Sequence, residues 1–116
     1  MLAALAGVLS SGVARAQEAS VELARIEFLR EAEEAARRGD HARALDLARR
    51  GAALRTTPSV AHFLAREYEA LARPLEALAQ ATACSRGAEV DGGLRNRDAL
   101  LQACGALIER ATARVG

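Results

Sequence analysis

The sequence contains no lysine and no tryptophan, and it has only two prolines, two cysteines and three aromatic residues. The scarcity of aromatic residues argues against a β-sandwich, whose short strands are rich in aromatic and β-branched side chains. The formal net charge is only +1, so the sequence lacks the net basic character expected of a nucleic-acid-binding domain. With 51% hydrophobic residues, the chain also has too much apolar material for a disordered segment.

Alanine and leucine are abundant instead, and together they account for 45 of the 116 residues. Both are strong helix formers. All 16 basic residues are arginine, and they are nearly balanced by 15 acidic residues. A chain of this length makes one domain at most. We therefore expect a single all-α domain that packs through alanine and leucine.

The first sixteen residues have the order of a secretory signal sequence. No residue from Leu2 to Ala14 is charged, and Ala14 and Ala16 place small side chains at the two positions that a signal peptidase reads. The apolar run is too short to span a bilayer. We expect cleavage after Ala16 and a mature chain, residues 17–116, that is periplasmic or secreted. A helix packed on the domain and a membrane anchor remain as alternatives.

Five further segments carry helical periodicity or helix end signals. They are residues 21–38, 41–54, 59–72, a segment from Pro74 to about residue 84, and 96–113. Ser20 is the expected N-cap of the first segment, Gly39 its stop signal and Asp40 the N-cap of the second. Ile26 and Leu75 are among the side chains expected to point inward. The glycine-bearing stretch 85–95 is expected to be a loop.

The helices show an internal repeat. Ala44-Leu45 and Ala77-Leu78 coincide at a shift of 33, and the third and fifth segments superpose at a shift of 40. Helix-turn-helix units with a period near 34 are typical of tetratricopeptide repeats. With Gly39-Asp40 at the first turn and Tyr68 in the third segment, the sequence resembles this family. The resemblance implies a right-handed stack of antiparallel hairpins: unit one at 21–54, unit two at 58–85 and a partial third unit at 96–113.

The resemblance also implies a function, because such stacks bind partners in a groove lined by the first helix of each hairpin. The lining residues that it implies are Glu33, Arg37, His62, Arg66, Glu69, Gln102, Glu109 and Arg110. The lysine and asparagine set that grips a terminal carboxylate in some members is absent, although Arg37 and Arg66 could pair with acids. Each of these residues could instead be part of an ordinary solvated helix surface.

Cys84 and Cys104 are the only cysteines. Two thiols in an exported protein usually pair. If the fourth helix ends at Cys84, a simple hairpin places that residue opposite the start of the fifth helix, and the long loop must supply the slack for a bond. We expect a Cys84–Cys104 disulfide, with two separate buried thiols as the alternative.

No catalytic motif stands out. Gly92-Gly93 is not followed by the lysine of a phosphate-binding loop, and no serine elbow is present. We interpret the glutamate clusters, including Glu67 and Glu69, as surface ion pairs with nearby arginines. The wide spacing between the two histidines and two cysteines disfavours a zinc site. The sequence thus predicts no enzymatic activity, no cofactor and no metal.

Two functional hypotheses follow. The first is a non-catalytic interaction module that binds a partner protein or peptide, without nucleic acid or a membrane span in the mature chain, and that could form a homo-oligomer. The second is a structural N-terminal fragment of a larger cell-envelope protein that has no binding activity of its own.

Overall fold

The computed structural model describes the backbone of residues 2–116 and the side chains of residues 12–116. Helices account for almost all of this part of the chain, and it contains no strand. The helices are α1 (Leu2–Arg37), α2 (His41–Leu54), α3 (Pro58–Ala70), α4 (Pro74–Val90) and α5 (Arg97–Val115). The predicted all-α fold is therefore confirmed.

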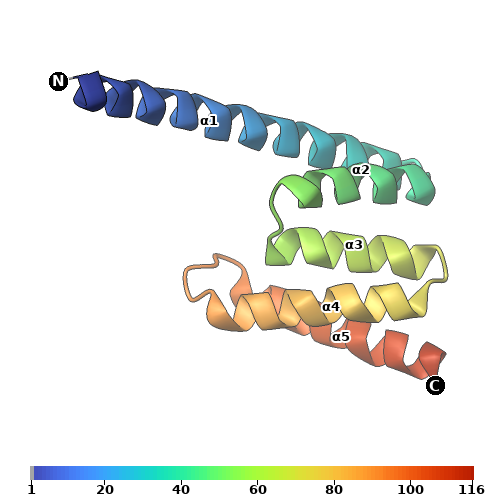
Figure 1. Ribbon diagram of the computed structural model, residues 1–116. Helices are drawn as coiled ribbons and strands as arrows, with labels where there is room; N and C mark the ends of the chain where they lie inside the picture. The colour runs from blue at the N-terminus through green and yellow to red at the C-terminus, as the bar shows by residue number, and fades with distance from the viewer. Residues whose placement is uncertain (1) are drawn as a thin grey trace.

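The helices form a stack in which each one packs on the next along the chain (Figure 1). Successive helices run antiparallel, because connections of a few residues return the chain alongside the helix that it has just left. The α1–α2 pair lies at one end of the stack and the α4–α5 pair at the other. A further contact joins α5 to α3, and it closes the lower part of the stack.

Two of the turns have the same backbone structure. Gly39 and Ala72 each have a positive φ, +79° and +57° respectively. The amide of the next residue, Asp40 or Arg73, bonds to a carbonyl five residues earlier at 2.9 Å. This is the usual left-handed stop of a helix. Asp40 then caps α2 as predicted, since its carboxylate accepts a hydrogen bond from the amide of Arg43 at 3.2 Å.

The predicted start of the first segment at Ser20 is wrong. The helix continues through Ser20, because the residues before it include no proline and several alanines, and nothing there interrupts the backbone hydrogen bonds. Residues 12–20, which we call the overhang, are all exposed. Part of the predicted signal segment, residues 1–11, lies outside the residues whose side chains are described. A helix packed on the domain would bury part of its side chains, whereas residues 12–16 are all exposed.

The predicted loop at 85–95 is wrong only in its first part, because residues 85–90 are helical. The fourth helix runs on to Val90, and the connection is only residues 91–96. Gly87 favoured the prediction of a loop because glycine usually weakens a helix. In the structure it allows a close approach, since a Cβ atom there would lie 3.0 Å from the ring of Pro58 at the start of α3. The glycine therefore serves helix packing and does not end the helix.

Small side chains make up much of the interior. The buried alanines are Ala32, Ala35, Ala44, Ala48, Ala61, Ala65, Ala77, Ala81, Ala88 and Ala111. Leucines such as Leu45, Leu64 and Leu107 fill the remaining space between the helices. Because alanine reaches only a short distance from the backbone, the helices can lie close together without gaps.

Two residues expected to point inward are exposed. Leu75 is 64% exposed, because α4 turns Ala77, Ala81 and Cys84 toward its neighbours and leaves Leu75 outside this row. Ile26 is 50% exposed, because it lies toward the uncovered part of α1. In both helices the alanines make the close contacts, and the larger aliphatic side chain lies beside them.

A disulfide joins the last two helices. Cys84 and Cys104 are bonded, with their Cα atoms 6.3 Å apart, and both residues are fully buried. Cys84 lies six residues before the end of α4, and Cys104 lies seven residues after the start of α5. The two positions are therefore opposite each other in an ordinary antiparallel hairpin. Since α4 extends to Val90, no slack in the connection is needed.

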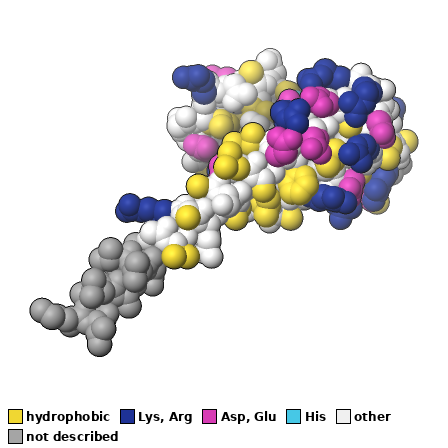
Figure 2. Space-filling model, turned by 90° about the horizontal axis from the view of Figure 1, so that it is seen from above, with side chains coloured by type: hydrophobic (Ala, Val, Ile, Leu, Met, Phe, Trp, Pro, Cys, Tyr) yellow, Lys and Arg dark blue, Asp and Glu magenta, His cyan; other side chains and the backbone are white. Residues whose placement is uncertain are grey.

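The surface has two different regions. Seen from above, most positive and negative side chains mingle on the side of the molecule away from the projecting end of α1, while hydrophobic side chains lie nearer that end (Figure 2). Leu23, on α1, is 69% exposed. Within the part of the chain that the structure describes, no helix combines the length and the apolar character that crossing a membrane requires.

Candidate functional site

A groove lies between α1 and α3. It consists of two hollows of about 330 Å³ and 240 Å³. The first is lined by Glu33, Ala36, Arg37, His41, Phe63, Arg66 and Glu67, and the second by Arg25, Leu29, Glu33, Thr57, Ser59, Val60 and Phe63. Since Glu33 and Phe63 belong to both linings, the two hollows are neighbours along one groove.

The helical period explains why these side chains meet. Glu33 and Arg37 are four residues apart on α1 and therefore share one face of that helix. Phe63 and Arg66 are three residues apart and share one face of α3. Ala36 also lines the first hollow, and its short side chain leaves the space open. Three of the predicted groove residues, Glu33, Arg37 and Arg66, thus lie around one hollow.

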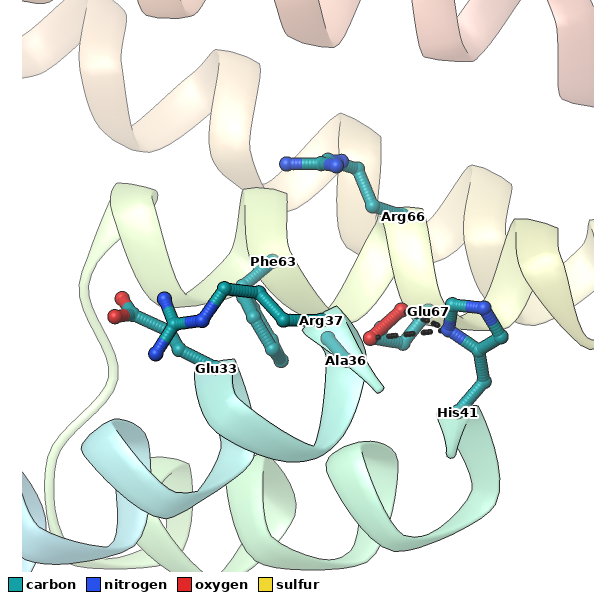
Figure 3. Close-up of a pocket in the computed structure, with 7 residues that line it drawn as sticks. All are labelled: Glu33, Ala36, Arg37, His41, Phe63, Arg66 and Glu67. Atoms are coloured by element: carbon teal, nitrogen blue, oxygen red, sulfur yellow. Dashed lines mark hydrogen bonds and ion pairs between the residues drawn. The ribbon is translucent and has the colours of Figure 1, made fainter. Parts of the chain in front are cut away.

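The two arginines of the first hollow are exposed and make no ion pair with any side chain that the structure describes. They come from different helices, Arg37 from the last turn of α1 and Arg66 from the middle of α3. Arg37 extends past the ring of Phe63 toward Glu33, and Arg66 extends in the same direction but ends above Phe63 in the view (Figure 3). Their guanidinium groups are therefore available to a ligand.

The opposite side of this hollow holds a buried carboxyl group. The Glu67 side chain is only 5% exposed, and its Oε2 lies 3.0 Å from Nδ1 of His41 (Figure 3). The interpretation of Glu67 as part of a surface ion pair with an arginine is therefore wrong. Glu67 lies three residues after Leu64 and seven after Val60, which places it on the buried face of α3. That helical phase was the sequence signal that could have identified it.

Two other predicted groove residues pair with each other. Nε of Arg110, on α5, lies 2.8 Å from Oε2 of Glu69, and its Nη2 lies 3.1 Å from Oε1. This two-point hydrogen bonding lowers the pKa of Glu69 below its usual 4.5, with the Arg110 charge adding to the effect. The pair links α3 to α5. Glu69 and Arg110 are therefore engaged within the chain and are less available to a partner.

The last three predicted groove residues lie apart from the two hollows. His62 is half-buried, and this burial, aided by the charge of Arg66, lowers its pKa below 6.5. Gln102 and Glu109 are exposed on α5 and line neither hollow. Of the eight predicted residues, the structure thus gathers three around a hollow, pairs two, and leaves three elsewhere.

The second hollow is bordered by another charge network. Oε1 of Glu22 lies 2.7 Å from Nη2 of Arg25 on the same helix and 2.9 Å from Nη2 of Arg55, just beyond α2. Hydrogen bonds from Arg25 and then Arg55 lower the pKa of Glu22 to about 2. Glu22 therefore ties the middle of α1 to the end of α2.

The described side chains offer little for other chemistry. Among them, no three histidine, cysteine, aspartate or glutamate residues lie close enough to hold a metal ion. Both sulfurs are used in the disulfide. No buried side-chain nitrogen or oxygen in this part of the chain lacks a hydrogen-bond partner. The groove can therefore supply apolar contact, guanidinium groups and one free carboxylate.

Comparisons with known proteins identify no relative of this chain. The chain has no match among protein-family models, curated proteins or solved structures. The likeness to tetratricopeptide repeats therefore remains a prediction from the sequence, beside an all-helical stack that the structure does show.

Proposed function

We propose that this chain is a non-catalytic binding module that holds a segment of a partner protein in the α1–α3 groove. The observation that carries the proposal is the pair of adjoining hollows that share Phe63 and Glu33. A continuous concave surface with an aromatic side chain at its centre and charged groups along its edges suits a peptide.

We also propose that the module works outside the cytoplasm. Disulfides persist in oxidising compartments such as the periplasm and are rare in the cytosol. The buried Cys84–Cys104 bond supports export, as does the signal-like order of residues 1–16. The mass of the protein recovered from the periplasm of a bacterial host tests this, because cleavage after Ala16 gives a chain that begins at Gln17.

Selection of displayed peptides on the oxidised protein tests groove binding. Ala36→Leu should fill the first hollow without changing any charge, and we expect it to abolish binding of the selected peptides. Ala53→Leu is the matched control, because Ala53 is exposed on α2 and lines neither hollow. Equal binding to both variants, or no enriched peptide, would contradict the proposal.

A second candidate function rests on a different observation. Leu23 and Ile26 expose apolar surface at the end of the stack that α1 forms. Such a surface also suits a structural part of a larger envelope protein, whose remaining domain would cover it. In that case the isolated chain should bind no peptide in the groove and should melt without a sharp transition. A cooperative melt together with groove binding would favour the binding module.

A further inference from the structure

Only some of the charged side chains along the groove have an ion-pair partner. Glu67 pairs with His41, and Arg25 is held by Glu22. Glu69, on the neighbouring face of α3, pairs with Arg110. Among the charged residues that line the two hollows, this leaves Arg37, Arg66 and Glu33 without an ion pair to any described side chain. The first hollow therefore has two free positive groups and one free negative group.

The two free arginines can act on one ligand group. Arg37 and Arg66 belong to opposite walls of the same hollow and extend in the same direction (Figure 3). A guanidinium group has a planar set of donors that matches the two oxygens of a carboxylate. Two such groups around one hollow favour an anionic group there over a neutral or positive one.

The neighbouring hollow favours a different side chain. Phe63 stands between the two hollows, and Leu29 and Val60 line the far side. Arg25, the one basic residue there, is already paired with Glu22. This hollow therefore suits an aliphatic side chain, and the two hollows together suit an acidic residue beside an apolar one.

We infer that the groove selects a peptide segment in which an internal glutamate or aspartate lies between Arg37 and Arg66 while an adjacent aliphatic side chain packs beyond Phe63. This inference rests on the proposed peptide-binding function. An internal residue fits better than a chain terminus, because the groove continues past Phe63 and accommodates chain on both sides. Glu33, at the boundary of the hollows, disfavours a second acid and so sets the direction of the segment.

The probes are three short peptides added to isotopically labelled oxidised protein and followed by NMR. The first contains leucine next to glutamate and is capped at both ends, and the second replaces the glutamate by glutamine. The third has leucine and glutamine with a free terminal carboxylate. We expect the first peptide alone to shift the Nε–Hε signals of Arg37 and Arg66 and the ring signals of Phe63. Added salt should weaken the effect, because the charges are exposed.

Substitutions separate the contributions of the three charges. Arg37→Gln and Arg66→Gln should each weaken binding of the glutamate peptide about two- to fivefold, as for an exposed ion pair. Glu33→Gln should strengthen it by a similar factor, because a repulsive charge is removed. Arg43→Gln is the matched control, since Arg43 is exposed on α2 and lines neither hollow. The amide spectrum of each variant verifies that the fold is retained.

The outcomes distinguish the inference from the function on which it rests. Equal shifts with the glutamate and glutamine peptides at Phe63 would overturn the selection for an acid but leave groove binding intact. Shifts with the free-carboxylate peptide alone would replace the internal acid by a chain terminus. An absence of groove shifts with every peptide, together with failed peptide selection, would overturn both.

Discussion

Ala72 adopts a backbone conformation that most L-residues avoid. Its φ of +57° lies in the left-handed region, where a Cβ atom approaches the neighbouring carbonyl oxygen. The equivalent position in the first hairpin is Gly39, which has no Cβ. The same turn thus occurs twice. Glycine at position 39 adopts it without strain, whereas alanine at position 72 adopts it at a conformational cost.

Ala72→Gly and Gly39→Ala should have opposite effects on stability. Ala72→Gly should raise the free energy of unfolding by about 1 kcal/mol, because the left-handed strain is removed. Gly39→Ala should lower it by about 1 kcal/mol, and since no other atom lies within 4 Å of the added Cβ, the cost is conformational. Urea denaturation of the two variants measures both effects, and changes of the same sign would contradict the explanation.

His62 gives the stability a pH dependence. Its pKa is lowered below 6.5 by burial and by the charge of Arg66, so the unfolded chain binds a proton more readily than the folded one. This contribution is fully present above about pH 6.5 and is lost as the pH falls through the folded-state pKa. Thermal melts between about pH 7.5 and 5.5 should show a steeper loss for the wild type than for His62→Gln. Parallel curves would rule out this contribution.

At the scale of helices, the disulfide determines how firmly α5 is held. It closes a segment of about twenty residues, and a bond of this span stabilises a domain by about 3 kcal/mol. We expect urea denaturation in the presence of reductant to show a free energy of unfolding lower by that amount. Because both cysteines are buried, reductant under native conditions should leave the bond intact. An equal free energy of unfolding in urea with and without reductant would contradict the expected stabilisation.

The residue patterns predicted the helices better than their ends and their inward faces. The turn at Gly39 was predictable, because it carries a strong local signal. Ser20 and Gly87 carry similar signals, but packing and a long run of helix formers prevail over both. The buried face of α4 was misjudged because hydrophobicity favours Leu75, whereas close helix contact selects Ala77 and Ala81.

The candidate site was predictable in part for a similar reason. The family likeness implied that Glu33, Arg37 and Arg66 line a groove, and all three line the first hollow. Neither could reveal that Glu69 is held by Arg110, because that pair depends on the distance between α3 and α5. Phe63 is partly buried against the core, and it also lines the groove because α1 and α3 leave a space there.

At the scale of the whole molecule, the overhang contributes little to the fold. Its side chains are all exposed, and packing of α1 begins near Glu22. A chain that begins at Gln17 should therefore unfold with a free energy within about 0.5 kcal/mol of the full chain. A chain that begins at Glu27 lacks the Glu22 network and should unfold more easily. A large loss in the first truncation would show that the segment before Gln17 supports the stack.

The pairing of each helix with its neighbour in sequence also has a kinetic consequence. Contacts between segments close along the chain form early, since little loop entropy is lost before they form, and such topologies fold in microseconds to milliseconds. Thiol oxidation takes seconds or longer. The α4–α5 hairpin should therefore bring its two sulfurs together before they are oxidised. Disulfide formation then covalently fixes a contact that folding has already formed.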